Sequence, residues 1–88
     1  MGRKTLVEKL LKAIDDREND DSTYLIIYDF TWNSRPNKEF YHSLARLGGV
    51  FVNRSCVLVK GRKYAIAIKL LARHYGAKVH AYRIAEEL

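Results

Sequence analysis

The sequence predicts a single α+β domain. Apolar residues recur at helical spacing in three segments, and short β-branched and aromatic runs typical of strands occur in four others. At 88 residues the chain is shorter than the ~100–200 residues of a usual domain. We therefore expect one core built from the whole range 1–88. Hydrophobic residues make up 48% of the chain and charged residues 30%, an ordinary globular composition, so we expect the chain to fold.

The N-terminal part predicts a helix and a linker. Thr5 and Glu8 have the spacing of a capping box, and the apolar residues around them recur at helical spacing, so residues 5–15 should form a helix. Residues 16–22 are polar, largely acidic and without periodicity, which is typical of a flexible linker. We expect this linker to lead into the core of the fold at residues 23–85.

Residues 23–30 predict a central strand. They are rich in β-branched and aromatic residues, and apolar side chains fall on both alternating faces. A strand covered on both faces needs two layers, and in so small a domain the second layer would be the N-terminal helix or another subunit. Asp29 interrupts the apolar run near the end of this strand.

The next segments predict a helix and two short strands. Pro36 suits the first turn of a helix with one apolar side, and Gly48-Gly49 ends that helix. Residues 50–53 and 56–59 are predicted to be strands. The residues between them, Asn53-Arg54-Ser55, form either a hairpin turn or a bulge.

The last third predicts a turn, a helix and a strand. The turn covers residues 60–63, the helix runs over residues 64–75 to Gly76, and the strand covers residues 78–85. Without the N-terminal helix, the order is the βαββαβ arrangement of ferredoxin-like folds. Such a fold places both helices on one face of a four-stranded sheet. The other face is then exposed to water, functional, or covered by a partner.

The charge distribution favours a polyanionic partner. The formal net charge is +6, but residues 31–83 carry eleven Lys or Arg and one acidic residue, Glu39, while each flank is net acidic. A sustained positive field concentrates polyanions and releases counterions when phosphates are neutralised. We therefore expect binding to nucleic acid, DNA or RNA; the alternative is a solvated surface that only keeps the protein soluble.

Several function classes are disfavoured by composition. No apolar run approaches the ~18–20 residues of a membrane span, and the N-terminus has no signal-peptide core. Cys56 is the single cysteine, so no internal disulfide can form, and a reducing compartment fits best. We expect a soluble, cytoplasmic protein with no membrane partner.

Asp29 is the best candidate for chemistry. A carboxylate at the end of a central strand lies where loops meet, and there it could hold Mg²⁺ or Mn²⁺ against a phosphate. One carboxylate is a poor metal site unless a two-fold axis brings a second copy alongside it. The alternative is that Asp29 caps the following loop, residues 31–35, through backbone hydrogen bonds.

Two segments carry features of phosphate and base recognition. Trp32 lies beside Asn33 and Arg35, where an aromatic ring and a guanidinium group could stack on bases and hold phosphate, although Trp32 could equally cover a small core. The turn from Lys60 to Lys63 holds three cations before a helix N-terminus, which favours a bound phosphate.

Three segments resemble a known family. Ile26-Ile27-Tyr28-Asp29-Phe30, the stretch from Gly48 to Val57 and Lys78-Val79-His80-Ala81-Tyr82-Arg83-Ile84, in this order, resemble the small CRISPR-associated Cas-two family and the related virulence-associated D proteins. The resemblance covers about residues 23–85. It implies a ferredoxin-like fold and a homodimer in which Asp29 of each subunit approaches the two-fold axis.

The resemblance also implies an activity. A divalent metal between the two Asp29 residues would serve a metal-dependent endonuclease, and Arg35 and Arg54 would hold the nucleic-acid backbone. Members of the family also act as non-catalytic DNA scaffolds. The function predicted is therefore a nucleic-acid-binding homodimer, either a nuclease or a non-catalytic DNA- or RNA-binding module of a mobile element. The expected nucleic-acid-binding residues are Trp32, Asn33, Arg35, Lys38, Arg54, Lys60, Arg62 and Lys63.

Overall fold

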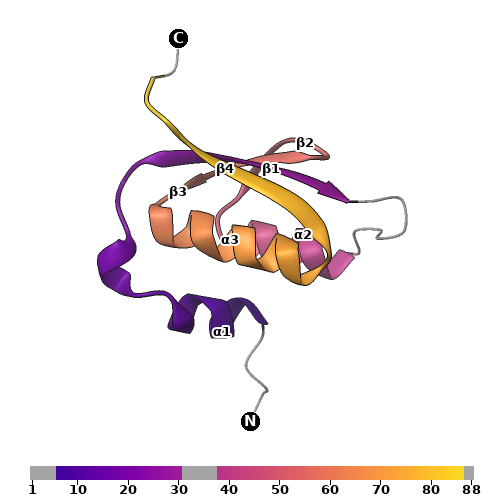
Figure 1. Ribbon diagram of the computed structural model, residues 1–88, viewed down its shortest axis with the longest axis horizontal. Coiled ribbons are helices and arrows are strands. Elements are labelled where there is room, and N and C mark those ends of the chain that lie inside the picture. Colours follow the sequence, from indigo (N-terminus) through magenta and orange to yellow (C-terminus); the bar gives the residue numbers. More distant parts are fainter. Residues whose placement is uncertain (1–5, 31–37, 87–88) are drawn as a thin grey trace.

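The computed structural model of the protein describes residues 6–30 and 38–86 (Figure 1). These ranges contain helices and one antiparallel sheet, which confirms the α+β class. Thr5 and Pro36, at which two of the helices were expected to begin, lie outside the described residues. None of the helices in the described ranges is long and apolar enough to cross a membrane. In chain order the elements are α1 (Leu6–Ala13), the short 3₁₀ helix η1 (Asp16–Glu18), β1 (Thr23–Phe30), α2 (Lys38–Arg46), β2 (Val50–Asn53), β3 (Cys56–Lys60), α3 (Arg62–His74) and β4 (Ala77–Ile84).

The four strands form one antiparallel sheet in the order β2-β3-β1-β4. β1 lies in the middle and pairs with β4 along its whole length, from Thr23 opposite Ile84 to Phe30 opposite Ala77. Both α2 and α3 lie on the same side of this sheet (Figure 1). The arrangement is compatible with a ferredoxin-like fold.

The segment between β2 and β3 contains both of the features between which the sequence left a choice. Arg54-Ser55 is the turn of a β-hairpin, and the register of the two strands shifts between Phe51 and Asn53. An extra residue in one strand of a pair bends that strand and increases its twist. The hairpin turn lies close to the end of β1, because the backbone N–H of Tyr28 donates a hydrogen bond of 2.9 Å to the carbonyl oxygen of Ser55.

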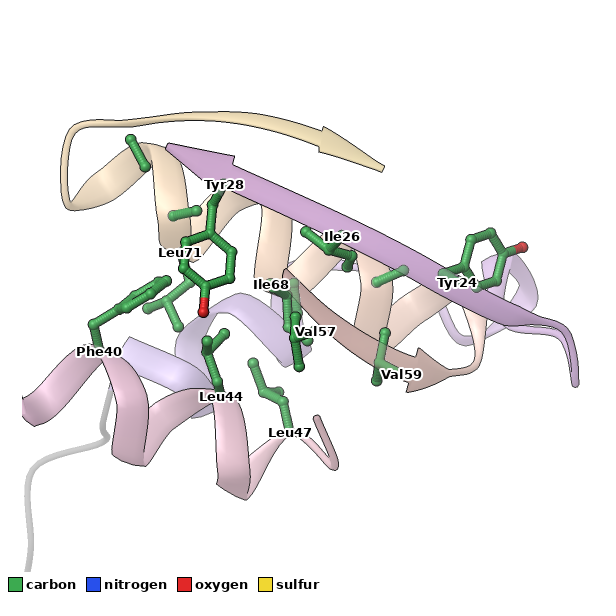
Figure 2. Close-up of a cluster of buried hydrophobic side chains, with 14 of the residues drawn as sticks. Tyr24, Ile26, Tyr28, Phe40, Leu44, Leu47, Val57, Val59, Ile68 and Leu71 are labelled. Carbon is green, nitrogen blue, oxygen red and sulfur yellow. The ribbon is translucent and has the colours of Figure 1, made fainter. Parts of the chain in front are cut away.

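The core lies between the sheet and the two helices. Tyr24, Ile26 and Tyr28 alternate along β1 and are buried on the helix side. They pack against residues of α2 and α3, as Figure 2 shows for Phe40 and Leu44. The hydroxyl group of Tyr28 is buried and has no hydrogen-bond partner among the described residues. Burial, with a smaller contribution from Tyr41, raises the pKa of Tyr28 to about 12.

Helix α1 forms a further layer outside α3, on the side away from the sheet (Figure 1). Val7 is buried there, and Glu8 forms a salt bridge of 3.7 Å with Arg46 at the end of α2. The apolar residues of α1 recur at helical spacing and form the stripe that packs against α3. The N-terminal helix therefore does not cover the second face of β1.

The second face of the sheet, called the open face below, is covered by none of the described elements (Figure 1). Leu25, Ile27 and Asp29 of β1 point to this face, because they alternate with the buried residues. Directly paired residues share a face, so the register places an apolar row across all four strands. This row consists of Val50, Leu58, Leu25 and Tyr82.

Candidate nucleic-acid interface

Asp29 lies on the open face at the end of β1. Its side chain is exposed, and in the register it stands opposite Lys78 of β4. Beside it a shallow hollow of about 200 Å³ is lined by Asp29, Arg54 and Ser55 together with aromatic residues. Two residues predicted from the sequence to contact nucleic acid or metal, Asp29 and Arg54, are therefore neighbours in space.

The β2–β3 hairpin positions Arg54 beside Asp29. The side-chain oxygen of Asn53 accepts a hydrogen bond of 2.8 Å from the backbone N–H of Ser55, which is the local closure typical of Asn in turns. The carbonyl oxygen of Ser55 is in turn bound to the backbone N–H of Tyr28, the residue before Asp29. A guanidinium group so placed can bind a phosphate oxygen while a carboxylate stands next to it.

Asp29 would supply one carboxylate per chain to the metal site predicted from the sequence. Among residues 6–30 and 38–86 no group of three or more His, Cys, Asp or Glu side chains is arranged to hold a metal ion. Hard divalent cations take oxygen ligands, and Mg²⁺ usually keeps several waters and binds through one or two carboxylates. Asp29 together with a symmetry-related Asp29 would supply two carboxylates and would fit that requirement. A single chain supplies one of the two.

The other predicted basic residues lie at the opposite end of the sheet. Lys60 stands opposite Thr23, at the start of β1, and Arg62 and Lys63 begin α3. Asp29 lies six positions after Thr23 along the strand, which corresponds to about 20 Å. The predicted turn over residues 60–63 is therefore the junction of two elements, because Lys60 ends β3 and Arg62 and Lys63 belong to α3, and this junction is separate from the hollow at Asp29.

The remaining predicted residues are near the Asp29 end or outside the described ranges. Lys38 is exposed at the first position of α2, which begins close to the end of β1 (Figure 1). Trp32, Asn33 and Arg35 lie outside the described residues.

The N-terminus of α3 is capped by residues far away in the sequence. One carboxylate oxygen of Asp20 accepts from the backbone N–H of Arg62 at 3.0 Å, and the amide oxygen of Asn19 accepts from that of Lys63 at 3.2 Å. Gly61, with φ of +98°, allows the sharp entry into the helix. The segment expected to be a flexible linker therefore supplies a helix cap, and the amides proposed for phosphate are used within the protein.

The side chains of the same segment add further contacts. Asp20 also accepts from the hydroxyl of Tyr24 at 2.7 Å and from the backbone N–H of Ser22 at 3.1 Å. Asp16 forms an ion pair with Lys63. Of the three cations in the predicted phosphate turn, Lys60 and Arg62 are exposed, whereas Lys63 is half-buried beside Asp16.

This cap predicts an acid-sensitive contribution to stability. The hydrogen bond from Tyr24, followed by those from the backbone, lowers the pKa of Asp20 below its ordinary value of 3.8. A carboxylate with a lowered pKa in the folded state stabilises the protein above its unfolded pKa, and this stabilisation is lost as the pH falls through the folded pKa. Asp20→Asn should lower the melting temperature by several degrees at pH 7, and the difference from wild type should shrink below about pH 4.

The neighbouring Asp21→Asn is the matched control, because Asp21 is exposed and its substitution makes the same change of charge. Thermal unfolding followed by circular dichroism between pH 3 and pH 7 measures both variants. An equal loss of melting temperature in the two variants, or a difference from wild type that does not change with pH, would contradict the capping role.

Three basic residues outside the predicted set share a surface with Arg62. Arg62, Lys69 and Arg73 are spaced at i, i+7 and i+11 on α3, so they lie on one side of the helix. Arg83 on β4 is paired with Tyr24, next to the same end of α3. The helical spacing was visible in the sequence, but without the strand register nothing connected it to Arg83.

The chain matches no family model, no curated protein and no solved structure.

Proposed function

We propose that this protein binds nucleic acid as a homodimer with a ferredoxin-like fold similar to that of the Cas-two family, and that Asp29 is its metal-binding and catalytic residue. The observation that carries the proposal is the surface charge. Among the described residues no charged side chain is buried. Residues 38–83 carry ten Lys or Arg and one acidic residue, Glu39. An excess of cations of this size, most of them exposed, favours phosphate binding through counterion release.

The ferredoxin-like assignment is supported by the sheet. The order β2-β3-β1-β4, with α2 and α3 on one face, follows from two interleaved βαβ units around a central β1. Such an arrangement leaves one sheet face without helices, and that is the open face of this protein.

A homodimer is supported by the apolar character of the open face. Val50 is 65% exposed, Tyr82 54% and Ile27 38%, so large apolar side chains are left in contact with water. Exposed apolar patches of this kind mark interaction surfaces, and a two-fold axis lets one patch pack against its own copy. Asp29 lies on the same face, so packing of two open faces about a two-fold axis close to the end of β1 would bring two carboxylates toward one another.

The chemistry proposed for Asp29 needs both copies. Two carboxylates would hold Mg²⁺ or Mn²⁺, which would activate a water molecule and neutralise the phosphodiester. Arg54, in the same hollow, would hold a phosphate oxygen and orient the backbone. A non-catalytic nucleic-acid-binding module is the second candidate, favoured by the hollow itself, because among the described residues that line it Asp29 is the one carboxylate.

The test combines binding and cleavage. Labelled single- and double-stranded DNA and RNA are incubated with wild type and Asp29→Asn, with Mg²⁺, with Mn²⁺ and with chelator, and the same samples are examined by gel shift. Asp29→Asn should reduce metal-dependent cleavage at least ~100-fold, while binding is retained. Glu86→Gln, an exposed carboxylate beyond the end of β4, is the control and should cleave as wild type does.

The outcomes separate the parts of the proposal. Binding without cleavage by the wild type would remove the catalytic role and leave the non-catalytic module. Absence of binding to every nucleic acid would overturn the proposed function. Leu58→Lys places a charge in the apolar row of the open face, so sedimentation should show a monomer for this variant if the dimer forms there.

A further inference from the structure

One side of α3 forms a basic surface next to the edge of the sheet. Arg62, Lys69 and Arg73 lie on this side, and over eleven residues of helix they span about 16 Å. Ile66 lies between them in the same row. This length corresponds to roughly five phosphate steps along one strand of a duplex.

The edge strand β4 completes the surface. A shallow groove of about 150 Å³ between α3 and β4 is lined by Arg62, Lys69 and the small residues Ala65 and Ala81, with Tyr24 at its floor. The small side chains of Ala65 and Ala81 leave space between the cationic side chains, so a ligand can approach the backbone closely there. Arg83 is the residue of β4 opposite Tyr24, and therefore lies on the helix side of the sheet beside the groove.

Two of these cations, Arg62 and Arg83, act on the hydroxyl group of Tyr24. The hydrogen bond to Asp20 and burial raise the pKa of Tyr24, and the positive charges of Arg62 and Arg83 act in the opposite direction. The geometry agrees, because Arg62 lines the same groove as Tyr24 and Arg83 is paired with Tyr24 in the sheet. Asp20 is the acidic residue at this end of the groove, and its carboxylate is already engaged by Tyr24 and by backbone amides.

We propose that Arg62, Lys69, Arg73 and Arg83, called the basic strip, bind the phosphate backbone of nucleic acid without regard to its sequence. This inference rests on the proposed function and names the surface and the mode of recognition. The groove offers cations, small residues and the aliphatic side chain of Ile66, and its aromatic residue, Tyr24, is only 8% exposed, so bases cannot stack on it. Phosphate contacts alone fix position and carry no sequence information. The strip is separate from the open face, so it stays accessible in a dimer that packs through that face.

A purely structural role predicts different behaviour. Charged side chains on an edge strand such as β4 also prevent edge-to-edge association of sheets. A role of that kind would change self-association when the charge is removed, whereas phosphate binding changes affinity and its dependence on salt.

The test compares two double variants with the same change of charge. Lys69→Gln/Arg73→Gln removes two cations from the strip, and Lys9→Gln/Lys12→Gln removes two exposed cations from α1. Binding of wild type and variants to two duplexes and two single strands of unrelated sequence is measured by fluorescence anisotropy between 50 and 300 mM salt. The strip variant should bind every sequence on the order of tenfold more weakly. Its salt slope should fall by roughly 1.4 to 1.8, because each lost phosphate contact contributes ~0.7 for single strands and ~0.9 for duplexes.

Each other result has a definite meaning. Equal losses in the strip and α1 variants would overturn the strip as a site and leave only a general attraction by net charge. Unchanged affinity of the strip variant would overturn phosphate binding by Lys69 and Arg73, and increased self-association with unchanged affinity in Arg83→Gln would assign that residue of β4 to edge protection instead. A strip variant that discriminates between sequences would overturn sequence-independent recognition. Absence of binding by the wild type to all four probes would reject the proposed function itself. Circular dichroism of each variant confirms that it is folded.

Discussion

Phe40→Ala is expected to lower the free energy of unfolding by about 3–5 kcal/mol. Phe40 is fully buried, and its ring contacts those of Tyr28, Phe30 and Tyr75 edge-to-face, with centroid distances of 5.2, 5.1 and 5.6 Å. Figure 2 shows it pointing from α2 toward Tyr28. Removal of the ring would leave a cavity between α2 and the sheet and would take away several aromatic contacts at once.

The loss would be a large part of the total stability. Domains gain roughly 0.05–0.15 kcal/mol per residue on folding, so a chain of this size has about 4–13 kcal/mol in all. Urea denaturation measures the change. Phe51→Ala is the matched control, because Phe51 is 43% exposed and its ring contacts Tyr41 at 5.8 Å. A loss of about 1 kcal/mol is expected there, and equal losses for the two variants would contradict the proposed centre of the core.

Gly49→Ala should destabilise the protein by about 1–3 kcal/mol. A Cβ atom at Gly49 would lie 2.7 Å from Cγ2 of Val57 and 2.9 Å from the carbonyl oxygen of Leu44, so backbone or core would have to move. The backbone N–H of Gly49 also donates to that carbonyl oxygen at 2.9 Å, closing the end of α2. The close approach of β2 to the helix end therefore depends on the absence of a side chain.

Gly48 provides the comparison, because it needs glycine for a different reason. Its φ is +85° and nothing lies within 4 Å of the position that a Cβ atom would occupy, so space is available and only the backbone conformation is restrictive. Gly48→Asn should stay within about 1 kcal/mol of wild type, since Asn tolerates the left-handed conformation. Chemical denaturation measures the free energy of unfolding of both variants. A larger loss of stability at Gly48 than at Gly49 would show that backbone conformation outweighs packing there.

Local patterns predicted much of the fold. The helical spacing after Tyr64 and the closing Gly76 match α3, and the apolar run over residues 23–30 matches β1. Periodicity reports which side of an element is apolar, and glycine reports where the backbone turns. The hairpin turn and the bulge before Cys56 occur together, a combination that spacing alone did not resolve.

The parts that depend on distant contacts were not predicted. Asn19 and Asp20 lie in an acidic stretch without periodicity, and their hydrogen bonds to α3 join residues that are more than forty positions apart. The two apolar sides of β1 suggested two covering layers, the second being the N-terminal helix or another subunit. Within the chain α2 and α3 cover one face, α1 packs on α3 instead of the second face, and Ile27 lies exposed on that face. The candidate site was also not predicted as a unit, because Asp29 and Arg54 are brought together by the pairing of strands, which the sequence alone does not give.

The cap on α3 also bears on the order of folding. Helices and short hairpins form within microseconds, because their contacts are close in the sequence, whereas contacts between distant segments wait for loop closure. α3 and the β2–β3 hairpin can therefore form early, while Asp20 reaches the backbone of Arg62 only after a loop of 42 residues has closed. We expect the N-terminal segment to dock late, so that its contacts slow unfolding more than they speed folding.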